Sequence, residues 1–420
     1  MEKKILDFVV VGSGPSAIGA LIGIKKKNFA VITGEIKNKK KLYKKNIHKK
    51  ILYEELNSNK SFLTNIFKNK KNSVFSISKV GGFGNYWGQG CEYVPFEKLN
   101  NKKIFKNKSQ YLKIINYIYN FFNIVRNKKF IKLNNQFFYP SPLLKNSPNK
   151  NNTNLMSFKT AYFYLVKKKN FLSINSSVIK IKNINNNLEI KLKNNTKILT
   201  KKIFLSANTV GNSKILFESD KDIEKISFCD DCPKKIYAIS FNKKFNDFIK
   251  NHYSIISSKL NNYFTSTYNM KKINLSFILF YIFGIKISFL EKYKSSFLGM
   301  INFFQYWSRS TRVQAILSRN MTYLEKKKIN QKILNYTKIL KSNSIYPVLV
   351  SDTRFGEGFH FHNLKIKKNK KWHDLEFYLK KKYNNKVFCI DASNENKINP
   401  GPFTISQMAI AYQKINLINK

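Results

Sequence analysis

The sequence predicts an α/β protein with a parallel sheet at its centre, and three parts of the chain indicate this class. Near the N-terminus, a β-rich run at 6–11 precedes a glycine turn, a helix candidate at 16–27 and a second strand at 29–32. In the middle, alternation of apolar residues with a period of two predicts a small antiparallel meander within 171–205. At the end, a strand and a terminal helix are expected within 387–420. Strands that alternate with helices are typical of α/β folds.

Length and composition are those of a folded protein. The chain has 420 residues, of which 43% are hydrophobic and 15% aromatic, so it can bury a substantial core and is not a disordered polyelectrolyte. Its 16 glycines and 4 cysteines exclude collagen-like chains and disulfide scaffolds.

The chain is strongly basic, with 77 Lys and Arg against 23 Asp and Glu and a formal net charge of +54. Lysine is spread along the whole sequence and is over-used together with Asn, Ile, Phe and Tyr, which share AT-rich codons. A nucleic-acid binder concentrates its charge, so we expect a solvated lysine surface and no specific nucleic-acid partner. Peripheral contact with an anionic membrane is the alternative that this charge favours.

No targeting segment is expected. The apolar run after the first residues is short and ends in a glycine turn without a small-residue cleavage site. The longest apolar stretch, at 275–290, contains Lys286 and is shorter than the ~18–20 residues of a membrane-spanning helix. The cysteine content does not suggest an oxidising compartment, so we expect a cytoplasmic protein.

The glycine turn after the first strand has the pattern Gly-x-Gly-x-x-Ala, which indicates a dinucleotide-binding site. The first glycine permits the tight turn, the second lets the backbone approach a pyrophosphate, and the alanine keeps the helix close to the strand. The helix N-terminus then faces the phosphates. The residues expected to bind the cofactor here are Gly12, Gly14, Pro15, Ser16 and Ala17.

An acidic residue is expected at the end of the second strand, where it would hold ribose hydroxyls. Thr33 occupies that position, and Glu35 lies just beyond it. Two interpretations stay open: Glu35 reaches the ribose, or it is simply exposed.

Four later segments carry further motifs. The stretch at 81–88, Gly-Gly-Phe-Gly-Asn-Tyr-Trp-Gly, is dense in glycine, which indicates close approach of the backbone to a ligand. A predicted strand and helix join at 203–219, and Gly-Phe-His-Phe follows at 358–361. Near the end stand Ile-Asp-Ala-Ser at 390–393 and Gly-Pro-Phe-Thr at 401–404.

With the opening turn, these segments resemble, in order, the motifs of the glucose–methanol–choline (GMC) oxidoreductases, a family of FAD enzymes. The likeness is greatest to short bacterial members that occur with sugar and polysaccharide pathways. It implies FAD as cofactor, oxidation of a CH–OH group, a sugar or sugar derivative as substrate, and an unidentified electron acceptor. Beyond the opening turn and Glu35, the resemblance places the cofactor against Gly82, Asn85, Trp87, Val178, Ala207, Asp391, Ala392, Pro402 and Thr404.

The resemblance implies that His360 takes the hydroxyl proton while hydride leaves for the flavin. Histidine suits this role near neutral pH, and the chain has only five. The second active-site residue of the family has no clean counterpart, because Pro402 stands at its position. Asn399 is the candidate, and His362 is another, although we expect His362 to face away from His360 in a strand.

The fold class is therefore α/β: a discontinuous Rossmann-type FAD-binding domain with a second α+β substrate domain. The FAD-binding domain is expected to comprise 1–100, 172–232 and 350–420. The substrate domain is expected to comprise 101–171 and 233–349.

Cys229 and Cys232 form a Cys-x-x-Cys pair that suggests two competing functions. Beside a flavin, such a pair is typical of a dithiol–disulfide oxidoreductase. A zinc site would need two more ligands, so no metal is expected. The alternative is that the spacing of the two cysteines is coincidental, because Asp231-Cys232-Pro233 falls where the family has Asp-His-Pro or Asp-Asn-Pro. A third alternative is a degenerate, non-catalytic protein that binds surfaces through its charge.

Overall fold

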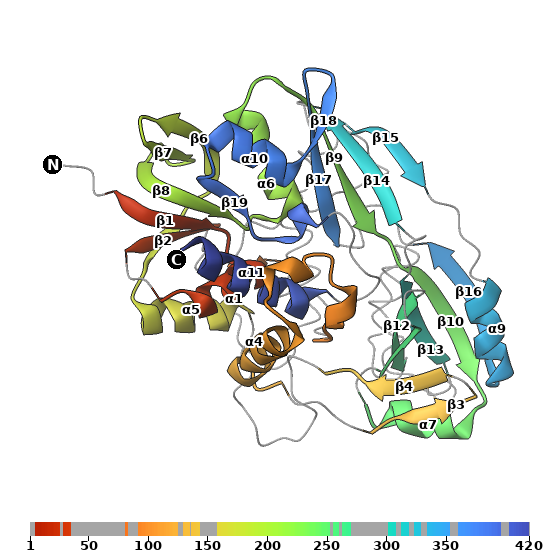
Figure 1. Cartoon of the computed structure of the whole chain (residues 1–420). Helices are drawn as coiled ribbons and strands as arrows, with labels where there is room; N and C mark the ends of the chain where they lie inside the picture. The colour runs from red at the N-terminus through yellow and green to blue at the C-terminus, as the bar shows by residue number, and fades with distance from the viewer. Residues whose placement is uncertain are drawn as a thin grey trace, which may run out of the picture.

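The computed structural model describes most of the chain, namely residues 5–25, 28–34, 80–82, 91–124, 129–134, 136–142, 158–252, 255–259, 263–269, 301–307, 312–318, 323–328, 334–352, 360–395 and 403–419. Three sheets organise these residues (Figure 1). The first lies at the left of the figure, the second at the right and the third at the upper right.

The first sheet has a parallel part and an antiparallel part. Its parallel strands are β5 (Leu172–Asn175), β2 (Phe29–Thr33), β1 (Leu6–Val11), β8 (Lys197–Leu205) and β19 (Val387–Cys389). The antiparallel strands β7 (Asn187–Leu192) and β6 (Val178–Ile184) extend it from β8. Because β1 is central and almost completely apolar, both of its faces can be covered by helices.

Helices cover both faces of this sheet. On one face lie α1 (Pro15–Gly23), α4 (Lys108–Phe121), α5 (Phe158–Lys169) and α11 (Thr404–Ile418), whose apolar side chains form one core with Phe8 and Val10. On the other face, α6 (Asn208–Ser219) and α10 (Leu375–Tyr383) form a second core with Val9 and Val11. The alternation of β1 side chains divides the two cores, as strand geometry requires.

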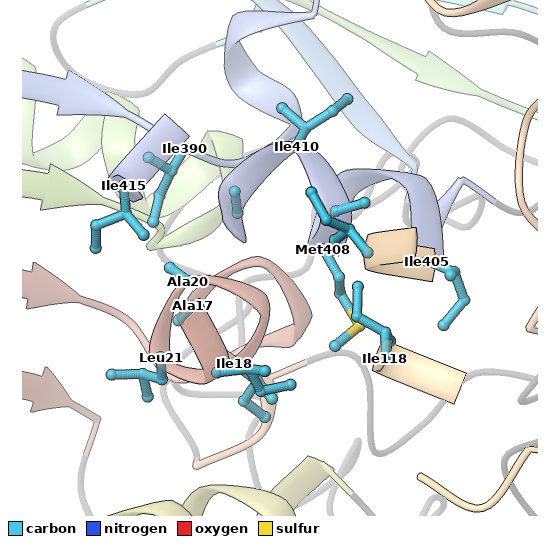
Figure 2. Close-up of a cluster of buried hydrophobic side chains, with 14 of the residues drawn as sticks. Ala17, Ile18, Ala20, Leu21, Ile118, Ile390, Ile405, Met408, Ile410 and Ile415 are labelled. Carbon is cyan, nitrogen blue, oxygen red and sulfur yellow. The ribbon is translucent and has the colours of Figure 1, made fainter. Parts of the chain in front are cut away.

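Helices α1 and α11 pack closely although they stand at opposite ends of the sequence. Figure 2 shows Ala17 and Ala20 on the side of α1 that is turned toward α11, the helix that carries Met408 and Ile415. A Cβ added at Gly19 would clash with the backbone of Met408, so the missing side chain permits this approach.

The second sheet is antiparallel. Its strands, in spatial order, are β16 (Ile345–Asp352), β10 (Lys234–Ser240), β13 (Ile301–Trp307), β12 (Tyr263–Asn269), β11 (Ile255–Lys259), β4 (Gln136–Pro140) and β3 (Ile131–Leu133). Helices α7 (Lys243–Lys250) and α9 (Leu334–Ser342) supply Phe245, Ile249, Tyr336 and Leu340 to the core on one face. The opposite face carries Trp307, which packs with Ile256 and Phe264.

The third sheet connects the other two. Its strands, in spatial order, are β15 (Tyr323–Lys328), β14 (Arg312–Ser318), β9 (Ile223–Asp231), β17 (Phe361–Lys368) and β18 (Lys371–Asp374). Strand β9 follows α6 of the first domain and leads through Cys232 and Pro233 into β10 of the second sheet (Figure 1). Short 3-10 turns at Phe96–Lys98, Lys102–Ile104 and Ala392–Asn394 complete the described elements.

The predicted fold class is confirmed: a Rossmann-type α/β unit is assembled from separate chain segments and joined to a second unit with an antiparallel sheet. Helices α4 and α5 lie in the segment 101–171 that we expected in the second domain, yet they share the core of α1. The domain boundaries stay a prediction. Within the described ranges, no helix is long and apolar enough to cross a membrane.

Candidate active site

Strands β1, β2, β8 and β19 are parallel, so their carboxyl ends meet at one edge of the first sheet, where ligands of open α/β sheets bind. Gly12 follows β1 with φ +117°, which only glycine adopts without strain. A Cβ there would clash with the carbonyl oxygen of Ser206, the residue after β8. The glycine turn therefore rests on the backbone between β8 and α6, which includes Ala207.

Gly14 is the N-cap of α1, and Pro15 begins the helix. No heavy atom of the described residues lies within 4 Å of the place where a Cβ of Gly14 would be, so this position is open within the described part of the chain. Gly82, with φ +54°, approaches it so closely that a Cβ there would lie 3.4 Å from Gly14 Cα. Gly81 N donates to Ser13 Oγ over 3.2 Å. The turn at Gly81–Gly82 is thus seated on the turn at Gly12–Gly14, and Ser16 and Ala17 are buried just behind it. We refer to these two turns as the glycine cradle.

The end of β2 supports the glycine cradle. Thr33 is buried, and its Oγ1 lies 3.0 Å from Ser13 Oγ. Thr33 also pairs with Asn175 at the end of β5. Val178, three residues later, begins β6 and packs against the second core.

The Asp391 carboxylate accepts hydrogen bonds from several chain segments, which the sequence did not predict. Its Oδ2 accepts hydrogen bonds from Asn208 N (2.9 Å) and Asn212 Nδ2 (3.0 Å), and its Oδ1 accepts from Ser393 N (2.9 Å). Asn212 is completely buried and was missed by the sequence reasoning. The carboxylate therefore holds the start of α6 against the turn after β19. We expected Asp391 to contact the cofactor, and its hydrogen bonds show that it fixes the backbone at this edge of the sheet.

The same network reaches β17. Ser393 Oγ donates to Thr209 Oγ1 over 3.1 Å, and Thr209 Oγ1 donates to the carbonyl oxygen of Phe361 over 3.0 Å. Phe361 stands between His360 and His362. The histidine segment is thereby tied to the edge that carries the glycine cradle.

The terminal helix begins at Thr404, as expected, and lies against the same edge. Gln407 Nε2 donates to the carbonyl oxygen of Ile390, one residue before Asp391, over 2.9 Å. Ala392 opens the short turn that follows and packs against the first core.

His360 lies immediately before β17. Its backbone N–H donates to Asp230 Oδ1 over 3.1 Å, and its ring centroid is 4.5 Å from that of Trp307 in β13. Burial lowers the pKa of His360 to about 4, although the Asp231 carboxylate opposes the shift. The ring is therefore neutral at pH 7 and has a lone pair with which to accept a proton. Trp307 belongs to a part of the chain without recognisable motif, so no sequence signal pointed to it.

His362 is completely buried in β17, and its Nδ1 lies 2.9 Å from the carbonyl oxygen of His360. The expectation that His362 faces away from His360 does not fit this contact, because Nδ1 reaches back to the His360 backbone and the charge of His362 acts on the pKa of His360. On β9 and β14, the neighbouring ion pair joins Arg312 Nε to Asp231 Oδ1 over 2.8 Å.

Cys229 and Cys232 are buried, reduced cysteines at the end of β9. Burial raises the pKa of the Cys229 thiol, which opposes the thiolate form that dithiol chemistry needs. Cys232 Sγ lies 3.5 Å from Asp230 Oδ2. The remaining predicted site residues lie outside the described residues: Glu35, Asn85, Trp87, Asn399 and Pro402.

Comparison with known proteins supports the fold. No protein-family model and no curated protein matches the sequence. Among solved structures, the chain is similar to pyridoxine 4-oxidase from Mesorbium loti, with a TM-score of 0.52 and 10% identity over 98% of this chain and 99% of that one. A flavoprotein/dehydrogenase from Cytophaga hutchinsonii aligns at a TM-score of 0.36 and 9% identity, over 98% of this chain and 76% of that one. A tetracycline destructase aligns at 0.34 and 10%, over 99% and 82%.

Proposed function

We propose that this protein is an FAD-dependent oxidoreductase of the GMC type that oxidises a CH–OH group of a sugar or sugar derivative. One observation carries the proposal. The edge that presents the glycine cradle is also the edge to which the Asp391 network ties the segment of His360. A dinucleotide site and a neutral histidine base thus belong to one site.

The residues present fit a dinucleotide. The open space at Gly14, closed on one side by Gly82, is a cradle that a side chain would fill. The first N–H groups of α1 have no partners within the helix and suit the negative charge of a pyrophosphate. When bound, FAD would accept a hydride from the substrate carbon.

The chain's own residues handle the proton. His360 accepts the hydroxyl proton on its unprotonated ring nitrogen, since burial keeps the ring neutral. Trp307 packs against this ring, with the two ring centroids 4.5 Å apart. The backbone bond from His360 N to Asp230 holds the segment in place.

The substrate class rests on sequence resemblance. The fold neighbour of highest similarity above is an oxidase of pyridoxine, which supports an oxidoreductase. The sugar assignment rests on the likeness of Gly-Phe-His-Phe at 358–361 to the short, sugar-associated members of the family.

The first experiment is the visible absorption spectrum of the purified protein. Flavin bands are expected, and mass spectrometry of the cofactor released by heat should identify FAD. A panel of monosaccharides and sugar nucleotides, added without oxygen, should contain a compound that bleaches these bands. A colourless protein that takes up no added FAD would overturn the proposal.

A pair of glycine variants tests the cradle. In Gly14→Ala the new methyl group meets no atom of the described residues, so the fold should survive while FAD binding weakens by at least about tenfold. In Gly12→Ala the methyl group clashes with Ser206 and φ is unfavourable, so the apoprotein itself should lose about 1–3 kcal/mol of stability. Thermal unfolding and FAD titration of both variants distinguish the two effects. Wild-type FAD affinity in Gly14→Ala would contradict the assignment of the cradle.

A further inference from the structure

His362 has one satisfied and one unsatisfied ring nitrogen. Its Nδ1 lies 2.9 Å from the carbonyl oxygen of His360. A carbonyl oxygen only accepts hydrogen bonds, so Nδ1 must carry the hydrogen. In the neutral ring, Nε2 is then a lone-pair acceptor. This buried Nε2 has no hydrogen-bond partner among the residues that the structure describes.

The ring stays neutral in its surroundings. Burial lowers the pKa of His362, and Arg312 lowers it further, while the Asp231 carboxylate and the bond to His360 raise it. Nε2 is therefore an acceptor at neutral pH. Most buried polar atoms in native proteins are paired, and this acceptor is available to a ligand or an ordered water.

The position of Nε2 points to the substrate rather than to the protein interior at large. His362 pairs with Cys229 on β9, whereas the adjacent Phe361 belongs to the apolar core on the other face of the sheet. Trp307 Nε1 is a second buried atom without a partner among the described residues, and its ring packs on His360. Indole N–H only donates and Nε2 only accepts, so two complementary unpaired groups belong to residues in contact with His360. A hydroxyl group can both donate and accept.

We propose that the substrate is a diol or polyol, in which one hydroxyl is oxidised at His360 and a second, neighbouring hydroxyl donates its hydrogen to His362 Nε2. This inference rests on the proposed function and names its substrate class. Without the second hydroxyl, the acceptor stays buried and unpaired. A site built to hydrogen-bond a hydroxyl discriminates strongly against analogues that lack it.

The experiment compares two compounds that differ by one hydroxyl, cis-cyclohexane-1,2-diol and cyclohexanol. Reduction of the bound flavin is followed by stopped flow without oxygen. For the wild-type protein, kcat/KM should be higher for the diol by about 10²-fold. Equal values for the two compounds would overturn the inference while leaving the proposed oxidation intact.

Two variants separate the nitrogens of His362. H362N keeps a nitrogen donor near Nδ1, for the His360 carbonyl, and removes the acceptor at Nε2. It should abolish the preference for the diol. H362Q places an amide oxygen near the position of Nε2 and should recover part of the preference. A preference that H362N leaves unchanged would contradict the proposal.

A spectroscopic readout does not depend on turnover. In protein labelled with ¹⁵N-histidine, the Nε2 resonance of His362, assigned by its loss in H362N, should be that of an unprotonated nitrogen and should shift when the diol is added. If the diol shifts this resonance but no compound reduces the flavin, the hydroxyl site stands and the proposed oxidation fails. A protonated Nε2 at pH 7 would overturn the inference.

Discussion

A buried polar cluster lies at each end of strand β17, and the two clusters differ in whether their polar atoms have partners. At its C-terminal end, the carboxylate of Asp220 accepts from Lys368 Nζ (2.9 Å) and Tyr378 OH (2.7 Å), and Lys382 Nζ lies 3.2 Å away. At its N-terminal end, His362 Nε2 has no partner among the described residues, and neither has Trp307 Nε1, which packs beside the strand.

The difference teaches how to distinguish a structural cluster from a functional one. Around Asp220, two cations and a hydroxyl group surround one buried anion, so the charge is matched within the protein. Around His360 and His362, the donor Trp307 Nε1 and the acceptor His362 Nε2 are buried without a partner among the described residues, and a ligand that both donates and accepts would complete them. We therefore expect substitutions at one end to affect stability and at the other to affect chemistry.

The largest effect is expected for His360→Asn. This change removes the ring that accepts the proton but preserves a small polar side chain. Reduction of the bound flavin by substrate should slow by about 10²–10⁴-fold, with flavin content and melting temperature near those of the wild type. Anaerobic stopped flow measures the rate. His373→Asn, at a partly exposed histidine of β18, is the matched control and should leave the rate unchanged. Equal rates in His360→Asn and the wild type would transfer the base to another residue.

The second effect is on stability. Asp220→Asn leaves Lys368 and Lys382 beside each other without their anion, so the free energy of unfolding should fall by about 3 kcal/mol at pH 7. Asp222 also pairs with Lys368, at 2.9 Å, but its side chain is 67% exposed. Asp222→Asn should cost less than about 1 kcal/mol and serves as the control. Urea unfolding measures both. Equal losses in the two variants would remove the contrast between buried and exposed pairs.

The stability that Asp220 contributes should be lost as the pH falls. Burial alone would raise the pKa of Asp220, but the bonds from Lys368, Tyr378 and Lys382 outweigh it and hold the pKa well below its usual range. A lowered pKa in the folded state stabilises the protein above the unfolded value of about 3.9. The gap between wild type and Asp220→Asn should therefore be constant from pH 7 to about pH 5 and shrink as the pH falls below about 4. A gap that grows in acid would refute this explanation.

The smallest effect is expected for the cysteine pair. Cys229 and Cys232 are buried, and the raised pKa of Cys229 opposes a thiolate. Replacing both with Ser should leave the rate of flavin reduction within about twofold of the wild type. Loss of turnover with flavin still bound would instead favour the dithiol interpretation.

Local features of this protein could be predicted from the sequence because they depend on neighbours in the chain. The strand at 6–11, the meander that became β6 to β8, and the helix start at Thr404 were all predicted, since side-chain period and proline placement act over a few residues. The need for glycine at position 12 was also readable, because a tight turn between strand and helix demands it.

Contacts between residues far apart in the chain were decided only by the tertiary structure. Asp391 meets Asn208 across 183 positions, and Trp307 of the second sheet packs on His360, which precedes β17 of the third. Neither contact leaves a periodic or compositional trace, because it depends on how whole sheets pack and not on local propensity. The sequence by itself determined a Rossmann-type cradle and a candidate histidine. The packing of the sheets decided that His362 is buried beside His360, with its Nδ1 at a carbonyl oxygen and its Nε2 without a partner among the described residues.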